Sequence, residues 1–240
     1  SIPQSLSPNL VQSDFTIEFW LKMDKTIKPY YSYPIYTQGN YDIDGQYLQI
    51  YIFNDSTNYI ISISLKNYYG CYYNVTSFIN NSWNHYSITY DNTSKNIILY
   101  VNGDEKEKRL NGFISNSSTY SDVNAQGNVV LGYSPNDFNK GIDDSYLVGE
   151  LKELRVFNIV KYNSNFDVNN LIYSTNIDSN TLLYIPMNES DSTIYTNNSV
   201  NSNVYDVINN PKDNLELYFP MNSNENKIYK KNSDKLGDDS

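Results

Sequence analysis

The sequence predicts an all-β protein built as an antiparallel β-sandwich, and three observations support this fold class. Tyrosine occurs 25 times and charged residues make up only 18% of the 240 residues, a composition that favours strands and turns. Short runs of alternating, β-branched or aromatic residues recur along the chain. Turn signals such as Asn102-Gly103 separate these runs, and Asn-Gly suits a type I′ hairpin because both residues tolerate positive φ. We therefore expect strands that each give one face to a shared core.

The first predicted strand covers residues 15–23, FTIEFWLKM, in which every second residue is apolar. Successive side chains of a strand point to opposite faces, so one face of this strand is expected in the core. The core residues are predicted to be Phe15, Ile17, Phe19, Leu21 and Met23. Trp20 falls on the other face of this strand. It is expected either to be buried under a loop or to form an exposed platform for a sugar ring. Trp83 is predicted to be a core residue.

Further strands are predicted wherever similar runs recur. They cover residues 47–53, 59–65, 85–90, 96–101, 128–133 and 147–157. One short helix is expected over residues 163–173, where Ser164 could cap the first turn and Phe166 and Leu171 could face inward.

The C-terminal part of the chain contains an internal repeat. LLYIPMN at residues 182–188 and LELYFPMN at residues 215–222 share an apolar-Tyr-apolar-Pro-Met-Asn phrase at a spacing of about 33 residues. We expect a sandwich over residues 1–187, a linker over 188–214, and a partial repeat over 215–240 that opens a second module or forms a short C-terminal β extension. Because the chain opens at Ser1 without an initiator Met, it is expected to belong to a longer multidomain protein.

Composition excludes several classes of function. The net charge of -10 argues against nucleic acid, whose binding needs Lys and Arg, and against anionic membrane surfaces. No apolar run approaches the roughly 18 residues that a spanning helix requires, so membrane insertion is not expected. The single Cys71 allows no internal disulfide, and the single His85 allows no site that needs two histidines.

Four phrases carry a resemblance to a known family. They are FTIEFWLKM at residues 15–23, SWNHYSITYDNTSKNIILYVNG at 82–103, NVVLGYS at 128–134 and GELKELRVFNIVKY at 149–162. In order and spacing they resemble laminin G-like domains of the concanavalin A-like lectin and glucanase superfamily, over residues 1–187. The closing strand keeps the family's Gly149, Glu153, Arg155 and Asn158 but has Lys152 where Asp is common. The resemblance implies an antiparallel jelly-roll sandwich of concanavalin A type; the jelly roll of clostridial neurotoxin binding regions is the alternative.

Enzymatic activity is not expected. Glucanases of the superfamily use two carboxylates on one face of a strand. Glu150 and Glu153 are three residues apart, and regular alternation would place them on opposite faces. His85 has no Ser or Cys elbow around it with which to form a catalytic triad, and it is predicted to be structural.

Binding through rim loops is the function predicted instead. Tyrosine offers flat apolar area and a hydroxyl at low entropic cost, which suits sugar rings and protein surfaces. The candidate ligand-binding residues lie in the runs YYSYPIY and NYYGCYY: Tyr31, Tyr33, Tyr69 and Tyr72. The expected partner is a glycan or a host surface protein, and the expected location is extracellular or on a particle or cell surface. A structural spacer or assembly domain of a larger surface, virion or toxin protein is the alternative function.

Two oxygen-rich loops are candidates for a calcium site. Carboxylate and amide oxygens are the ligands that Ca²⁺ prefers, and the resemblance implies such a site because many relatives of this fold carry one. The candidate ligands are Asp42, Asp44, Asn136, Asp137, Asp143 and Asp144. Solvated acidic turns without a metal are the alternative interpretation.

Overall fold

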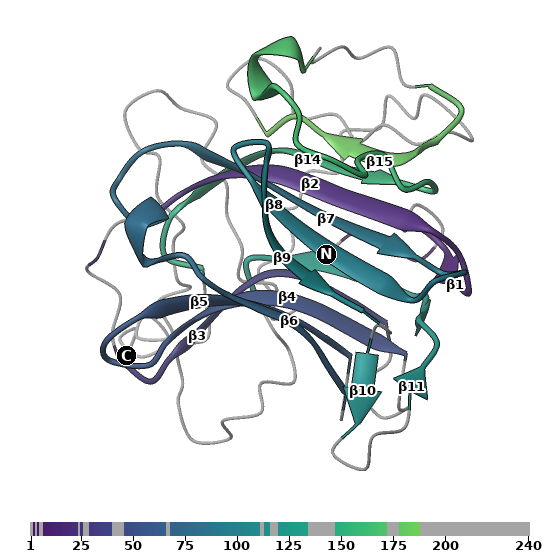
Figure 1. Ribbon diagram of the computed structural model, residues 1–240, viewed down its shortest axis with the longest axis horizontal. Helices are drawn as coiled ribbons and strands as arrows, with labels where there is room; N and C mark the ends of the chain where they lie inside the picture. The colour runs from purple at the N-terminus through teal and green to yellow at the C-terminus, as the bar shows by residue number, and fades with distance from the viewer. Residues whose placement is uncertain are drawn as a thin grey trace, which may run out of the picture.

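The computed structural model describes residues 2, 4, 7–23, 25, 29–39, 46–65, 68–110, 113–115, 120–133, 147–171 and 178–187. The linker and partial repeat predicted over residues 188–240 lie outside this range. Two antiparallel sheets pack face to face, as the sequence predicts (Figure 1). A two-stranded ribbon of β1 (Leu10–Val11) and β12 (Asn124–Ala125) accompanies them.

The smaller sheet has six strands and includes the opening strand of the sequence. Its order is β15 (Thr181–Ile185), β14 (Glu150–Phe157), β2 (Phe15–Lys22), β7 (Asn84–Asp91), β8 (Asn96–Val101) and β9 (Asp104–Arg109). The larger sheet has seven strands. Its order is β11 (Tyr120–Ser121), β10 (Phe113–Ser115), β6 (Tyr68–Asn74), β5 (Tyr59–Leu65), β4 (Tyr47–Asn54), β3 (Ser32–Gly39) and β13 (Val129–Leu131).

The core lies between the two sheets and takes one face of each strand. All five apolar residues predicted from residues 15–23 belong to this core, as expected. Phe19 stacks on Tyr86 of the neighbouring strand at 5.6 Å between ring centroids. The larger sheet contributes Ile50 of β4 and Ile61 of β5, among others. Burying side chains of this size is worth about 1.5 to 3 kcal/mol each, so the core is the main source of stability.

The Asn102-Gly103 turn between β8 and β9 forms as predicted. Both residues have positive φ, 52° at Asn102 and 83° at Gly103. A Cβ at Gly103 would lie only 1.9 Å from the carbonyl oxygen of Phe166. The absence of a side chain at Gly103 therefore lets the segment that follows β14 pack against this turn. Phe166 in turn donates its backbone N–H to the Gly103 carbonyl at 2.9 Å.

The helix predicted over residues 163–173 is wrong within the described part of that range. Only a three-residue 3-10 helix, η3 (Val168–Asn170), is present, and the Asp167 side chain caps it through the N–H of Asn169. The segment is instead hydrogen-bonded to the smaller sheet: Glu105 of β9 donates its N–H to the Asn165 side chain at 2.8 Å. A second 3-10 helix, η2 (Thr76–Phe78), precedes β7. No helix in the described part of the chain is long and apolar enough to cross a membrane.

The two tryptophans lie near each other on the outer side of the smaller sheet. The amino group of Lys152 lies 4.2 Å from the centre of the Trp83 ring and 5.9 Å from that of Trp20. Both tryptophans are half-buried. The assignment of Trp83 to the core is therefore wrong: it comes just before β7, and a cation covers its ring.

Candidate functional site

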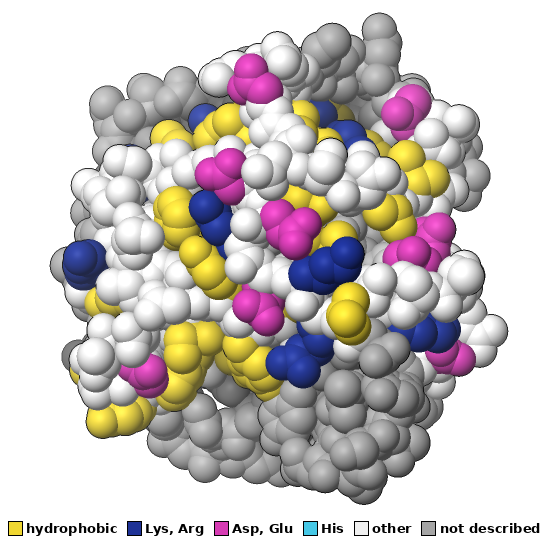
Figure 2. Space-filling model, viewed as in Figure 1, with side chains coloured by type: hydrophobic (Ala, Val, Ile, Leu, Met, Phe, Trp, Pro, Cys, Tyr) yellow, Lys and Arg dark blue, Asp and Glu magenta, His cyan; other side chains and the backbone are white. Residues whose placement is uncertain are grey.

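The charged residues of the molecule are divided unequally between the two sheets. None of the seven strands of the larger sheet contains Asp, Glu, Lys, Arg or His. The smaller sheet carries charges on most of its strands, and β9 reads DEKEKR throughout. Figure 2 shows one side of the molecule, on which acidic and basic side chains are interspersed with apolar ones rather than gathered by sign. The two sheets therefore present chemically different outer faces.

Strand pairing assembles two rows of side chains on the outer face of the larger sheet. Phe53 of β4 pairs with Ser32 and Ile60, and Ile60 pairs with Asn74. The next row is formed by Pro34, Tyr51, Ser62 and Tyr72. Neighbouring strands lie about 4.8 Å apart, so each row spans roughly 14 Å, enough for two sugar rings side by side. These positions alternate with core residues such as Ile52 and Ile61, which places them on the outer face.

The accessible members of these rows form a surface that we call the outer strip. It consists of Ser32, Tyr51, Phe53, Ile60, Tyr72 and Asn74. Tyr72 is 36% exposed and Asn74 is exposed, while the other four are half-buried. Ser62, between Tyr51 and Tyr72, is buried. The strip therefore offers aromatic and aliphatic area flanked by hydroxyl and amide groups, and carries no formal charge.

A further exposed tyrosine stands at the same end of the larger sheet. Tyr30 is 62% exposed, and its backbone N–H donates to the carbonyl of Asn54, the last residue of β4, at 2.6 Å. Its hydroxyl donates to the Ser56 hydroxyl at 3.2 Å. Tyr30 has a φ of +64°, which is uncommon for a bulky residue.

The structure divides the four tyrosines predicted to bind ligand. Tyr72 lies on the outer strip. Tyr31 is half-buried and packs against the core. Tyr33 is only 3% exposed and belongs to the core, so its assignment to a ligand-binding rim is corrected: it pairs with Ile52 on the inner side of β3. Tyr69 pairs with Ser64 and its side chain lies outside the described part of the structure.

The six candidate calcium ligands, Asp42, Asp44, Asn136, Asp137, Asp143 and Asp144, lie outside the described residues. Within the described residues, no group of three or more His, Cys, Asp or Glu side chains is arranged to hold a metal ion.

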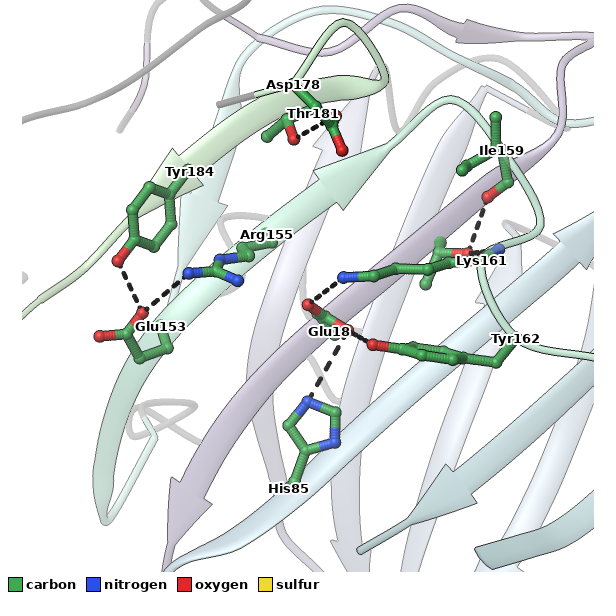
Figure 3. Close-up of polar contacts among 11 residues, drawn as sticks. Glu18, His85, Glu153, Arg155, Ile159, Lys161, Tyr162, Asp178, Thr181 and Tyr184 are labelled. Atoms are coloured by element: carbon green, nitrogen blue, oxygen red, sulfur yellow. Dashed lines mark hydrogen bonds and ion pairs between the residues drawn. The ribbon is translucent and has the colours of Figure 1, made fainter. Parts of the chain in front are cut away.

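The smaller sheet carries a buried polar cluster on its outer face (Figure 3). Glu18 of β2 is 1% exposed and accepts hydrogen bonds from the Lys161 amino group at 2.9 Å and the Tyr162 hydroxyl at 2.7 Å. The Nε2 atom of His85 lies 3.8 Å from Glu18. Thr16 anchors the same segment, because its hydroxyl donates to the Ile159 carbonyl and accepts from the Lys161 N–H.

Aromatic rings close this cluster against solvent. Phe166 stacks on Tyr162 at 3.6 Å between centroids and meets His85 edge-on at 5.9 Å. Trp20 meets His85 edge-on from the sheet at 5.3 Å. Glu18 and His85 are thus enclosed between the sheet and residues 158–171. We interpret the cluster as the latch that fastens this segment to the sheet, in line with the structural role predicted for His85.

The environment of His85 makes stability sensitive to pH. Burial disfavours the charged ring and lowers the pKa of His85 to about 4, against the opposing effect of Glu18. The folded protein therefore keeps His85 neutral while the unfolded chain takes up a proton below about pH 6.5. This contribution to stability is present above pH 6.5 and is lost as the pH falls towards 4.

We expect the free energy of unfolding to fall by about 1 to 2 kcal/mol between pH 6.5 and pH 5, measured by urea denaturation. His85 is the only histidine of the chain, and carboxylates with ordinary pKa values titrate mainly below this range. His85→Phe should flatten this slope whatever it does to stability at pH 7. An unchanged slope in the variant would show that another group is responsible.

The structure corrects the expected geometry of Glu150 and Glu153. Pairing between β14 and β2 shifts register between Lys152 and Arg155, and Glu153 has a φ of +54°. This bulge turns Glu153 to the outer face, where it accepts from the Tyr184 hydroxyl at 2.7 Å and from Arg155 at 3.5 Å. Glu150 also lies on that face, paired with Lys22 at 2.7 Å. Each carboxylate is thus held by its own cation, so the change of face does not create a pair sharing one substrate position.

Sequence reasoning missed Tyr51 and Phe53 as surface residues because it took its candidates only from the two tyrosine-dense runs, YYSYPIY and NYYGCYY. The signal that could have found them is the run YLQIYIF itself. Its alternate residues Leu48, Ile50 and Ile52 fill the core, which leaves Tyr51 and Phe53 on the outer face.

Comparison with known proteins agrees with this architecture. The laminin G-type family model described as the concanavalin A-like lectin/glucanases superfamily matches residues 2–163. The chain belongs to this superfamily. A search of curated protein sequences gave no match.

Solved structures with the superfamily fold resemble this chain at low sequence identity. A candidate carbohydrate-binding protein from Bacteroides ovatus is 18% identical with a TM-score of 0.50, over 74% of this chain and 46% of that one. The heptameric SAP-like pentraxin of Limulus polyphemus is 15% identical with a TM-score of 0.47, over 77% and 82% of the two chains. The binding domain of botulinum neurotoxin serotype D is 15% identical with a TM-score of 0.46, over 62% and 34%. The chain spans less than half of the Bacteroides protein, and at 18% identity the similarity to that protein describes the fold alone.

Proposed function

We propose that this chain is a non-catalytic binding module that takes carbohydrate on the outer strip of its larger sheet. The observation that carries the proposal is the exposed, aromatic and uncharged character of that strip, with Tyr72 as its most exposed ring. Aromatic rings stack on the apolar faces of sugar rings, and hydroxyl and amide groups beside them pair with sugar hydroxyls. Tyr72 and Asn74 supply both kinds of group two residues apart on the same face of β6.

The family and the fold support this ligand class. The description of the superfamily names lectins as well as glucanases. The Bacteroides protein is described as a candidate carbohydrate-binding protein, and we extend that ligand class to this chain. Affinity is expected to be modest, because a shallow polar surface loses much of its gain to desolvation.

Catalysis does not enter the proposal because the three carboxylates of β2 and β14 are engaged. Glu18 is enclosed beneath Phe166 and Tyr162, and Glu150 and Glu153 pair with Lys22 and Arg155. A hydrolytic pair would need one free nucleophile and one protonated acid facing a shared substrate position.

The test is glycan binding by the purified chain and by two variants. Tyr51→Ala and Tyr72→Ala should each weaken binding about 5- to 30-fold, the loss expected when one aromatic contact of about 1 to 2 kcal/mol is removed. The matched control is Trp83→Ala, which truncates another half-buried aromatic residue on the opposite sheet and should leave binding unchanged. Thermal denaturation should confirm that all three variants fold.

Two results would contradict the proposal. Binding that survives both tyrosine substitutions would remove the outer strip from the site. No binding to any glycan would favour the alternative of a spacer or assembly domain, or recognition of a host surface protein. We place the module outside the cell or on a particle surface, where such partners occur, as part of the same proposal.

Calcium is kept as a separate proposal, based on the acidic loops alone. Isothermal titration with CaCl₂ should detect binding that Asp42→Asn with Asp44→Asn, or Asp137→Asn with Asp143→Asn, removes. If neither double variant changed the heat of calcium binding, any calcium site would have to lie elsewhere in the chain.

A further inference from the structure

We propose that the outer strip selects uncharged glycans, built of neutral hexose or N-acetylhexosamine units, over their sialylated or sulfated forms. This inference rests on the proposed function and goes beyond it by naming the ligand class. Its basis is the unequal division of charge between the two sheets.

An anionic sugar needs a cation on the surface that receives it. Carboxylate and sulfate groups bind through charge-assisted hydrogen bonds, most often from Arg or Lys. The described residues of the outer strip offer only aromatic, aliphatic, hydroxyl and amide groups, and the strands around them contain no Lys or Arg. An anion placed there would lose hydration without gaining a cationic partner, which is costly.

Three basic residues on or beside β2 and β14 are held in ion pairs. Lys22 pairs with Glu150, Lys161 with Glu18, and Arg155 with Glu153. Lys152 lies over the Trp83 ring.

The charge at the rim of the strip is negative. Asp55 in the turn between β4 and β5 accepts the N–H groups of Thr57 and Asn58 at 2.8 and 2.6 Å. These hydrogen bonds favour the ionised form and lower the pKa of Asp55. Asn58 in turn accepts a hydrogen bond from the Asn74 side chain at 2.8 Å, which ties this turn to the outer strip.

The whole molecule adds to this local effect. Its net charge of -10 repels anionic ligands at low ionic strength. Uncharged ligands feel no such force, so their affinity should depend little on salt.

The experiment uses an array of matched glycans, in which each neutral oligosaccharide appears beside its sialylated and sulfated derivatives. The native chain should bind the neutral member at least about 10-fold more tightly at 150 mM NaCl, a ratio that corresponds to about 1.4 kcal/mol of desolvation cost for the unpaired anion. Neutral binding should change less than about twofold between 50 and 500 mM NaCl. Ile60→Lys, which adds a cation to the strip, should raise binding of the anionic members several-fold at 50 mM NaCl. Ile60→Gln is its uncharged control.

The outcomes separate this inference from the proposed function. Equal or tighter binding of the anionic members by the native chain would overturn the charge selectivity and leave the glycan-binding function standing. Absence of binding across the array would overturn both. Neutral binding unaffected by Tyr72→Ala would move the site away from the outer strip and overturn the selectivity argument with it.

Discussion

Replacing Phe19 with alanine is expected to lower the free energy of unfolding by about 3 to 5 kcal/mol, measured by urea denaturation. Phe19 is fully buried at the centre of β2 and stacks on Tyr86. The substitution takes apolar area from the core and leaves a cavity beneath β2. Because β2 is paired with β14 on one side and β7 on the other, it cannot easily move to fill that cavity. A loss of this size is a large fraction of the stability of a domain, so the variant should unfold at much lower urea concentration.

The matched control for this variant is the next residue on the same strand. Trp20→Ala removes a larger ring from the outer face, where Trp20 is half-buried. The expected loss is roughly half that of Phe19→Ala or less, because less apolar area leaves water on folding there. If Trp20→Ala destabilised the protein more than Phe19→Ala, the assignment of the two faces of β2 would be reversed.

Replacing Glu18 with alanine is expected to cost about 3 kcal/mol of unfolding free energy, the lower end of the range for breaking a buried ion pair. The substitution leaves the Tyr162 hydroxyl and the Lys161 amino group without their acceptor. The lower end applies because Lys161 keeps 26% of its side chain exposed and can recover water. Residues 158–171 should also exchange their amide hydrogens faster in the variant, since the latch no longer holds them.

Glu150→Ala provides the comparison for this second prediction. Glu150 pairs with Lys22 at 2.7 Å on the same sheet, but both side chains are about a quarter exposed. Ion pairs near the surface contribute at most about 1 kcal/mol, so this variant should be nearly as stable as the native chain. Equal losses from Glu18→Ala and Glu150→Ala would show that burial of the latch does not matter.

Features that depend on local patterns could be predicted from the sequence. Alternation identified the core face of β2, and the Asn102-Gly103 pair identified its turn, because both depend on neighbouring residues. The bulge at Glu153 could not be predicted, because it arises where β14 must pair with both β2 and β15. The helix expected over residues 163–173 failed for a similar reason: Phe166 finds its partners at Gly103 and Tyr162 in the folded molecule.

The candidate site was predicted only in part. Tyr72 was found because tyrosines are dense around it, but the same criterion also selected Tyr33, which is buried. Residue type does not reveal which face of a strand meets the core; strand pairing does. Pairing places Tyr72 beside Ser62 and Tyr51 on the outer face, and it places Tyr33 beside Ile52 on the inner one.

The division of charge suggests different tasks for the two sheets. The smaller sheet carries the buried ion pair and the latch that hold residues 158–171. The larger sheet leaves uncharged aromatic surface at the outer strip. If the outer strip binds glycan as proposed, substitutions there should leave the latch intact, and substitutions in the latch should leave glycan binding intact.

The most direct test is to follow tyrosine ring resonances by NMR in protein with ¹³C-labelled tyrosine while a neutral oligosaccharide is added. Resonances of Tyr51 and Tyr72, assigned by single substitution to phenylalanine, should shift and saturate with the ligand. Those of Tyr100 and Tyr162, on the outer side of the smaller sheet, should stay in place. Shifts confined to Tyr100 and Tyr162, with Tyr51 and Tyr72 unmoved in the presence of a bound glycan, would contradict the assignment of recognition to the outer strip.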